Sequence, residues 1–291
     1  MNRISKSSIK KLLEQYNLKP NKQMGQNFLI NEMVLKKIVN TADISENDIV
    51  LEIGSGLGGL THELALKAKK VIAIEKDKNI AEALKRILKN HKNIEIIQGD
   101  ILKLSDNKTL LSLSDYKITA NIPYYLTSAL IRLFLESKNP PQEIVLLIQK
   151  QVAQRICAKP PKMSLLAVSV QFYSCPKIIS RISKESFWPK PKVDSAILKI
   201  GNIKKPKNIN AEKFFQIVKA GFSAPRKQLA NNLSKELKID REKIKKALIK
   251  CEIDTQIRAE NIKVEDWKKI TSVISAPPLS FPGLTGESSN S

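Results

Sequence analysis

The residues best suited to chemistry form the tetrapeptide Asn121–Tyr124, which reads Asn-Ile-Pro-Tyr and directly follows a predicted strand. The exocyclic amine of adenine is a poor nucleophile because its lone pair is delocalised into the ring. The Asn121 side-chain oxygen and a carbonyl fixed by Pro123 could accept hydrogen bonds from both amine hydrogens and favour a pyramidal nitrogen. Tyr124 offers a flat face on which a flipped base can stack. The tetrapeptide therefore predicts alkylation of an adenine amine through positioning and electrostatics; the structural alternative is a strand-ending turn with a packed tyrosine.

A glycine-rich loop, Gly54–Gly59, follows the predicted strand Ile49–Ile53 and precedes a helix expected from about Leu60. Gly54 and Gly56 allow a sharp turn and let a ligand approach the backbone, and the start of the helix presents free N–H groups. The loop suits a dinucleotide and S-adenosylmethionine equally well, and a tight turn without a ligand is the structural alternative.

Two acidic residues follow the next two predicted strands. Glu75 lies about 20 residues beyond the first glycine, where a carboxylate can accept both ribose hydroxyls of an adenosine cofactor. Asp100 can accept from an adenine amine, and neighbouring Ile101 can pack against the ring. Ligand candidates at successive carboxyl ends of strands indicate an adenosine-containing cofactor, although they do not separate NAD from S-adenosylmethionine.

The elements that must position these residues alternate between apolar strands and periodic helices such as Asp77–Asn90, a pattern typical of βαβ units around a parallel sheet. The strands expected in this sheet are Ile49–Ile53, Val71–Glu75, Ile94–Gln98, Lys117–Asn121 and Glu143–Gln149. Three more strand candidates follow with little helix between them, which predicts an antiparallel edge: Leu165–Tyr173, Ile178–Ser183 and Asp194–Ile200.

The last third of the chain has a different organisation. Gly201–Asn210 is rich in Lys, Pro and Asn and is expected to be a linker. Only helical patterns follow, at Ala211–Phe222, Arg226–Leu237, Arg241–Lys250 and Val264–Ile274. We therefore expect a first domain at 1–202 with an N-terminal helical extension at 1–24, a lysine-rich helical domain at 203–275, and a disordered tail at 276–291.

The composition indicates a polyanionic partner. The 291 residues include 50 Lys+Arg against 28 Asp+Glu, a net charge of +22. Nucleic acid is the commonest partner of so basic a chain, and basic surroundings without direct binding are the alternative. With only two histidines and unpaired spacing of Cys157, Cys175 and Cys251, we expect reduced thiols and no metal site. No apolar run approaches the roughly 18 residues of a membrane span, and no signal peptide is recognisable, so a cytoplasmic location without a membrane partner is expected.

From about Gln23 to Thr271 the chain resembles the KsgA (RsmA) family of ribosomal RNA adenine dimethyltransferases. The matching segments are Gly25–Leu29, Glu52–Gly56, Asn121–Tyr124, Phe187–Ala196 and Arg258–Asn261. The resemblance implies an α/β class I (Rossmann-like) S-adenosylmethionine methyltransferase domain with a small C-terminal helical domain that binds RNA. It also implies dimethylation of the N6 amines of two adjacent adenines in the 3′-terminal hairpin of 16S (small-subunit) rRNA, as part of small-subunit biogenesis. The implied partner is small-subunit rRNA or a pre-30S particle, and a monomer is expected.

The resemblance also assigns residues. It implies cofactor contacts at Asn27, Leu29, Gly54, Glu75, Asp100 and Asn121, with S-adenosyl-L-methionine as the cofactor. Phe187, framed by Pro189 and Pro191, becomes a candidate second stacking face opposite Tyr124, with a packed core aromatic as the alternative.

The chain departs from the family pattern at several positions. Tyr125 stands where the family often has Asn, and Gln151 where many members carry Glu. Pro225 and Ala230 occupy places that are commonly basic, which puts the details of RNA docking by the second domain in doubt. These changes lie outside the residues expected to carry the chemistry.

Two other functions compete with this one. A large-subunit rRNA adenine N6-methyltransferase of the macrolide-resistance type would share the fold and the tetrapeptide. A ribosome-assembly or transcription factor could keep the fold without catalysis, but an intact Asn121–Tyr124 together with Glu75 and Asp100 argues against lost chemistry. An NAD-dependent enzyme would explain neither the charge nor the tetrapeptide.

Overall fold

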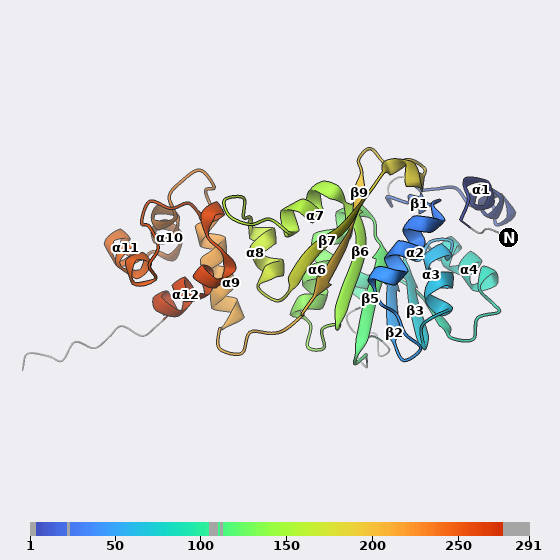
Figure 1. Ribbon diagram of the computed structural model, residues 1–291, viewed down its shortest axis with the longest axis horizontal. Coiled ribbons are helices and arrows are strands. Elements are labelled where there is room, and N and C mark those ends of the chain that lie inside the picture. The colour runs from blue at the N-terminus through green and yellow to red at the C-terminus, as the bar shows by residue number, and fades with distance from the viewer. Residues whose placement is uncertain (1–3, 22–23, 105–109, 111–112, 276–291) are drawn as a thin grey trace, which may run out of the picture. The chain divides into compact units, whose positions relative to one another are not determined.

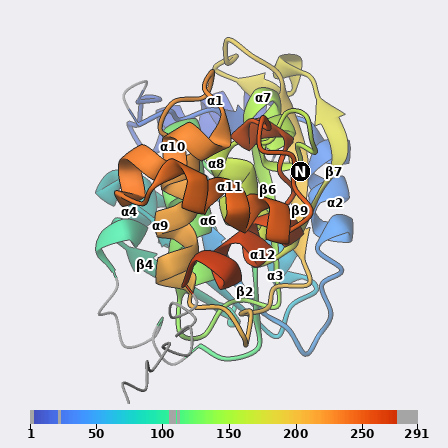
Figure 2. The same cartoon turned by 90° about the vertical axis from the view of Figure 1, so that its left-hand side faces the viewer.

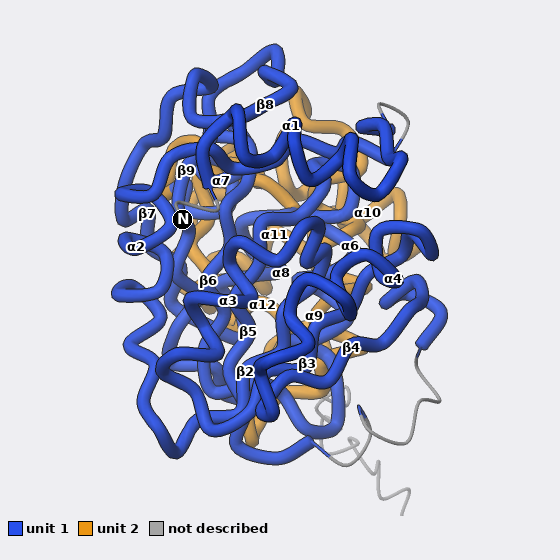
Figure 3. Tube along the Cα trace, turned by 90° about the vertical axis from the view of Figure 1, so that its right-hand side faces the viewer, with its two compact units in different colours: residues 1–158, 166–205 blue, residues 159–165, 206–291 orange. Residues whose placement is uncertain are grey.

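The protein is described by a computed structural model, which covers residues 4–21, 24–104, 110 and 113–275. The chain divides into two compact units (Figure 3). Unit 1 comprises residues 1–158 and 166–205, and unit 2 comprises residues 159–165 and 206–291. The sequence prediction placed residues 159–165 in the first domain, whereas they cluster with the second. The tail predicted at 276–291 lies outside the described residues.

Unit 1 is built on a seven-stranded sheet of order β4-β3-β2-β5-β6-β9-β7 (Figure 1). Its strands are β2 (Ile49–Ile53), β3 (Lys70–Glu75), β4 (Ile94–Gln98), β5 (Tyr116–Asn121), β6 (Glu143–Gln149), β7 (Cys175–Ile182) and β9 (Ser195–Gly201). The first five strands in this order, from β4 through β3, β2 and β5 to β6, pair in parallel. Strand β9 runs antiparallel to both β6 and β7. The predicted parallel sheet with an antiparallel edge is confirmed.

The helices of unit 1 follow the predicted alternation. They are α1 (Lys6–Gln15), α2 (Glu32–Thr41), α3 (Gly59–Ala65), α4 (Lys78–Ile87), α6 (Thr127–Glu136) and α7 (Lys150–Ile156). Helix α4 shows why: Asp77 caps its first N–H groups, and Ile80, Ala83 and Leu84 form one buried face. Helices α2 and α3 share a core cluster with residues of β2, β3 and β6.

One strand prediction is wrong. The segment predicted as the strand Leu165–Tyr173 forms helix α8 (Leu165–Gln171). A short, mostly apolar run fits a strand and a partly buried helix equally well, so hydrophobic periodicity cannot decide between them. The antiparallel edge therefore consists of β7 and β9 alone among the predicted candidates.

Unit 2 is helical over the part that the structure describes. Figure 2 shows α9 (Ala211–Gly221), α10 (Leu229–Leu237), α11 (Arg241–Lys250) and α12 (Val264–Ser275). Phe214 and Trp267 are fully buried in its core. A Cβ at Gly221 would lie 2.3 Å from Cη2 of Trp267, so the close packing of α9 requires glycine there. Helix α10 begins at Leu229 rather than at the predicted Arg226, because residues 222–228 turn between the two helices.

Short elements complete the site end of unit 1. Strands β1 (Phe28–Leu29) and β8 (Phe187–Trp188) form a two-stranded antiparallel sheet of their own. The 3-10 turns are η1 (Ile101–Lys103), η2 (Tyr124–Leu126) and η3 (Lys184–Ser186) in unit 1, and η4 (Ala259–Asn261) in unit 2. Among the described residues, no helix is long and apolar enough to cross a membrane.

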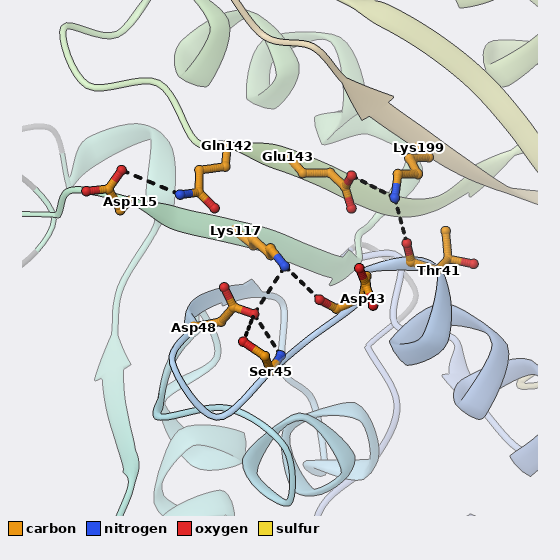
Figure 4. Close-up of polar contacts among 9 residues, drawn as sticks. All are labelled: Thr41, Asp43, Ser45, Asp48, Asp115, Lys117, Gln142, Glu143 and Lys199. Atoms are coloured by element: carbon orange, nitrogen blue, oxygen red, sulfur yellow. Dashed lines mark hydrogen bonds and ion pairs between the residues drawn. The ribbon is translucent and has the colours of Figure 1, made fainter.

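Lys117 ties the amino end of β5 to the connection between α2 and β2 (Figure 4). Its Nζ donates to the Asp43 carbonyl at 2.7 Å and to Oδ2 of Asp48 at 3.1 Å. Partial burial works to raise the pKa of the Asp48 carboxyl, but hydrogen bonds from Ser45 and Lys117 outweigh it and leave that pKa below its usual value. A second lysine joins β9 to α2 in a similar way. Lys199 forms an ion pair with Glu143 and donates a hydrogen bond to the Thr41 carbonyl (Figure 4).

We expect Lys117→Met to destabilise the protein by about 2 kcal/mol at pH 7, since it leaves a mostly buried carboxylate without its cation. The low pKa of Asp48 contributes stability that is present above the ordinary carboxyl pKa and is lost as pH falls through the folded-state value. Urea unfolding should therefore show the difference between variant and wild type shrinking on acidification. Lys70→Met, which removes the exposed ion pair with Glu95, serves as the control and should change stability far less. An equal loss of unfolding free energy in both variants would contradict a stabilising role of Lys117 beside Asp48.

Candidate active site

The candidate site lies at the carboxyl ends of the parallel strands, next to the point where the strand order reverses. From β2 the chain continues to β3 and β4 on one side of the sheet, whereas β5 and β6 lie on the other side of β2. Open α/β sheets bind ligands in the crevice at such a switch point. A pocket in unit 1 is lined there by residues that follow β2, β3, β4 and β5, including Gly54, Glu75, Asp100 and Asn121. The structure thus brings together the residues that the sequence predicts as a cofactor site.

The glycine loop lies next to the tetrapeptide Asn121–Tyr124. Gly54 has φ +75° and Gly56 has φ +54°, conformations that favour glycine. A Cβ at Gly54 would lie 3.6 Å from Cδ of Pro123 and 3.7 Å from the carbonyl oxygen of Asn121. Both distances are ordinary van der Waals contacts, so the loop and the tetrapeptide lie side by side, and it is the positive φ that favours glycine at position 54.

Glu75 organises the glycine loop. It is 7% exposed; its Oε2 accepts from the Gly56 N–H at 2.8 Å, and its Oε1 accepts from the Asp77 N–H at 2.9 Å. Burial raises the pKa of Glu75 against the opposing effect of these two backbone hydrogen bonds. The carboxylate oxygens have further lone pairs, so Glu75 can hold the loop and still accept from ligand hydroxyls.

Asp100 has a partner that the sequence analysis did not anticipate. Its Oδ2 lies 2.9 Å from Nζ of Lys76, and its Oδ1 accepts from the Leu102 N–H at 3.1 Å. The hydrogen bond from Lys76 is the main reason that the pKa of Asp100 is lowered. Ile101 beside it is 5% exposed and lines the pocket, as expected for a residue that packs on a flat ring. Lys76 follows Glu75 directly in the sequence, but that adjacency does not reveal that its ammonium group reaches Asp100.

The tetrapeptide is held in a defined orientation. The Asn121 Nδ2 donates to the Asn27 carbonyl at 3.3 Å, which assigns the amide nitrogen and leaves its Oδ1 to act as an acceptor. The Pro123 carbonyl accepts from the Leu126 N–H at 3.0 Å within η2. The carbonyl joined to the Pro123 ring nitrogen by the peptide bond is that of Ile122, which is therefore the candidate for the second acceptor.

The N-terminal segment reaches the site through the β1–β8 pair. Phe28 pairs with Trp188 and Leu29 with Phe187, which places Asn27 and Leu29 beside the tetrapeptide. Asn27 donates to the Gly25 carbonyl at 3.0 Å, and both Asn27 and Leu29 line the pocket. Patterns in the sequence did not single out these two residues, because a pair of two-residue strands is too short to show periodicity.

The aromatic candidates differ in exposure. Tyr124 is half-buried and its hydroxyl lies 2.9 Å from Oγ of Ser195. Phe187 lines the pocket but is only 3% exposed and belongs to the core cluster of α2 and α3. It therefore fits the packed-core alternative as the structure stands, and stacking on a base would require its ring to become exposed. Tyr125 is 61% exposed at the pocket.

Buried polar atoms with no partner point to a ligand at this pocket. Oε2 of Glu52 and Oγ of Ser55 are buried without a hydrogen-bond partner among the described residues, and both residues line the pocket. Such atoms are rare unless a water or ligand satisfies them. Together with the glycine loop and Glu75, they fit a ligand that carries several hydrogen-bonding groups. Among the described residues, no cluster of three or more His, Cys, Asp or Glu could hold a metal.

Glu52 is the most perturbed acid of the site. Burial, together with the charge of Glu75, raises its pKa to about 8, although the neighbouring Thr61 hydroxyl opposes the shift without a well-formed hydrogen bond. In the unfolded chain the Glu52 carboxyl ionises near its ordinary pKa, whereas in the folded protein it stays protonated up to a pH of about 8. Stability is therefore lost as pH rises from the ordinary value toward about 8.

We expect Glu52→Gln to remove this pH dependence without changing shape. Relative to wild type, the variant should gain on the order of 3 kcal/mol between pH 5 and pH 8, read from urea unfolding at both values. Parallel pH profiles of the two proteins would mean that Glu52 is ionised in the folded state at neutral pH.

Comparisons with known proteins agree with this geometry. The family profile described as "Ribosomal RNA adenine dimethylase" matches residues 17–276. The "Ribosomal RNA small subunit methyltransferase A" of Dehalococcoides mccartyi (strain CBDB1) is 42% identical over 263 residues, 90% of each chain. A dimethyladenosine transferase from Plasmodium falciparum superposes with a TM-score of 0.70 at 28% identity, covering 83% of this chain and 95% of that one. The 23S rRNA methyltransferase ErmE gives a TM-score of 0.70 at 25% identity, over 86% of this chain and 100% of that one. The predicted Rossmann-like methyltransferase fold is confirmed.

Proposed function

Because the chain belongs to the ribosomal RNA adenine dimethylase family, we propose that it dimethylates the N6 amines of two adjacent adenines in the 3′-terminal hairpin of small-subunit rRNA. The cofactor is S-adenosylmethionine. When bound, it supplies methyl groups activated on a sulfonium, which is a good leaving group and needs no acid or base to assist its departure.

The orientation of the Asn121 amide is the observation that carries this proposal. Its nitrogen is engaged by the Asn27 carbonyl, so its oxygen can accept one hydrogen of an adenine amine. The Ile122 carbonyl, fixed by the Pro123 ring, accepts the other. Two acceptors draw the amine toward a pyramidal shape and hold it, while Tyr124 supports the base from one face. The protein thus contributes acceptors already in place, which is the usual source of such rate enhancement.

The cofactor contacts follow from the same pocket. Glu75 accepts the ribose hydroxyls, Asp100 accepts the adenine amine, and Ile101 packs on the adenine ring. Asn27, Leu29, Gly54 and Gly56 line the methionine and ribose part, supported by the backbone of the glycine loop. The partnerless Oε2 of Glu52 is available for a hydrogen bond with a polar group at this end of the ligand.

The proposed substrate rests on the net charge of the chain and on its sequence similarity to named relatives. The net charge of +22 favours a polyanion, and a relative named for the small subunit is 42% identical over most of the chain. We propose that the substrate is a partly assembled pre-30S particle. We also propose that the protein acts as a monomer, since one copy of the chain supplies all of the pocket residues named here. The large-subunit alternative is weaker, because the large-subunit enzyme compared with it is 25% identical.

Methyl incorporation from labelled S-adenosylmethionine tests the proposal. Unmodified small-subunit particles, naked small-subunit RNA and large-subunit particles should be offered separately at the same salt concentration. We expect label in the small-subunit particle. Label confined to large-subunit RNA would assign the chain to the resistance-type activity, and tight subunit binding without label would make it a non-catalytic assembly factor.

A further inference from the structure

Ser195 lies at the meeting point of the antiparallel edge and the tetrapeptide. It is the first residue of β9 and is fully buried. Its backbone is paired on both sides, with Gln149 of β6 and with Ile182 of β7. A side chain on a strand held from both sides has little freedom, so its hydroxyl is a fixed point in the molecule.

That fixed hydroxyl meets the ring proposed to carry the base. The Ser195 Oγ and the Tyr124 hydroxyl oxygen are 2.9 Å apart and share a hydrogen bond. Tyr124 is also held at its other end, because its carbonyl accepts from the Thr127 Oγ1 at 3.1 Å and Thr127 is 2% exposed. The tyrosine is thus anchored at its main chain and at its phenol, and rotation of the ring out of place would break a buried hydrogen bond.

Resting on the proposed function, we infer that Ser195 is a positioning residue for methyl transfer: it fixes the plane of the Tyr124 ring on which the target adenine stacks. It acts through Tyr124 and does not touch the base. This gives the antiparallel β9 a role in catalysis besides completing the sheet, and it assigns a task to a residue of the Phe187–Ala196 segment that none of the cofactor or base contacts uses.

The energetics favour orientation over binding. A net hydrogen bond is modest in strength, but a misplaced reacting group slows a reaction more than it weakens binding, because only the aligned arrangement reacts. Burial raises the pKa of the Tyr124 phenol, with the Ser195 hydrogen bond opposing it and Asp194 adding to it. The phenol is therefore neutral at assay pH, so the hydrogen bond persists there.

A double-mutant cycle tests this inference in the full-length protein. The variants are Tyr124→Phe, which keeps the ring and removes the hydroxyl, Ser195→Ala, and the two combined. We expect each single variant to lower the single-turnover rate of methyl transfer about 5- to 15-fold, with KM for RNA and the Kd for S-adenosylmethionine changed less than about threefold. The double variant should be no slower than the slower single one, because both changes remove the same hydrogen bond.

One control variant and three further readouts separate a positioning role from structural damage. Ser272→Ala, an exposed serine of unit 2, should leave the rate unchanged. Losses in Ser195→Ala that extend to cofactor affinity and to the thermal unfolding midpoint would overturn the inference, since they would indicate a disturbed sheet. So would a Ser195→Ala rate within twofold of wild type, or multiplicative losses in the double variant. If wild type itself transfers no methyl to any adenine, the proposed function fails and this inference fails with it.

Discussion

Asn121→Ala should lower the single-turnover rate of adenine methylation by about 10³-fold or more, while RNA affinity stays within a few-fold of wild type. The variant removes the proposed acceptor for the reacting amine, so we expect the main loss in the transition state. Asn121 carries no charge, so we expect the electrostatic part of RNA binding to be retained. The two readouts are a rapid-quench methylation assay and filter binding of small-subunit RNA at fixed salt.

The matched control is Asn79→Ala, an exposed asparagine at the start of α4. It should behave like wild type in both assays. Normal turnover by Asn121→Ala would contradict the mechanism outright. A parallel collapse of RNA binding would instead show that the loss arises from damage to the pocket wall, since Asn121 also contacts the Asn27 carbonyl.

Glu75→Ala should weaken S-adenosylmethionine binding by about 100-fold or more. The change removes the proposed acceptor for the ribose hydroxyls, and it also releases the Gly56 N–H from its 2.8 Å hydrogen bond with Glu75. Hydrogen bonds to a charged group contribute about 1.5–3 kcal/mol each, and two such losses account for the size of the effect. Isothermal titration calorimetry with S-adenosylmethionine and with S-adenosylhomocysteine measures it without turnover.

The control for Glu75 is Glu82→Ala, which removes an exposed carboxylate from α4 and should leave the affinity unchanged. Glu75→Gln should fall between wild type and Glu75→Ala, because an amide has one acceptor oxygen in place of two. An affinity of Glu75→Ala within threefold of wild type would remove this residue from the cofactor site.

Sequence patterns identified the central sheet because its strands are buried on both faces. Strands such as Ile49–Ile53 and Glu143–Gln149 are short apolar runs bounded by turn residues, and the structure has both with the same bounds. The same logic failed at Leu165–Gln171, where a short, mostly apolar run is a helix that buries only Ala167, Val168 and Val170. The local sequence pattern indicates which residues are buried, but burial alone does not distinguish a helix from a strand.

The convergence of Gly54, Glu75, Asp100 and Asn121 was predictable from chain order, because carboxyl ends of parallel strands meet at one edge. Their individual roles stay predictions. What the sequence could not provide were long-range side-chain partners. Neither the contact of Lys76 with Asp100 nor that of Ser195 with Tyr124 follows from spacing, since each depends on how separate strand ends meet in space.

The most direct test of the central claim is the modification state of small-subunit RNA in cells that lack their own adenine dimethyltransferase and express this chain. The 3′-terminal fragment should be released by nuclease digestion and measured by mass spectrometry, with Asn121→Ala expressed at the same level as the control. The account predicts N6,N6-dimethyladenine at two neighbouring positions with the wild-type chain and unmodified adenines with the variant. An unmodified 3′-terminal fragment in cells expressing the wild-type chain, with or without methylated adenine in the large subunit, would contradict it.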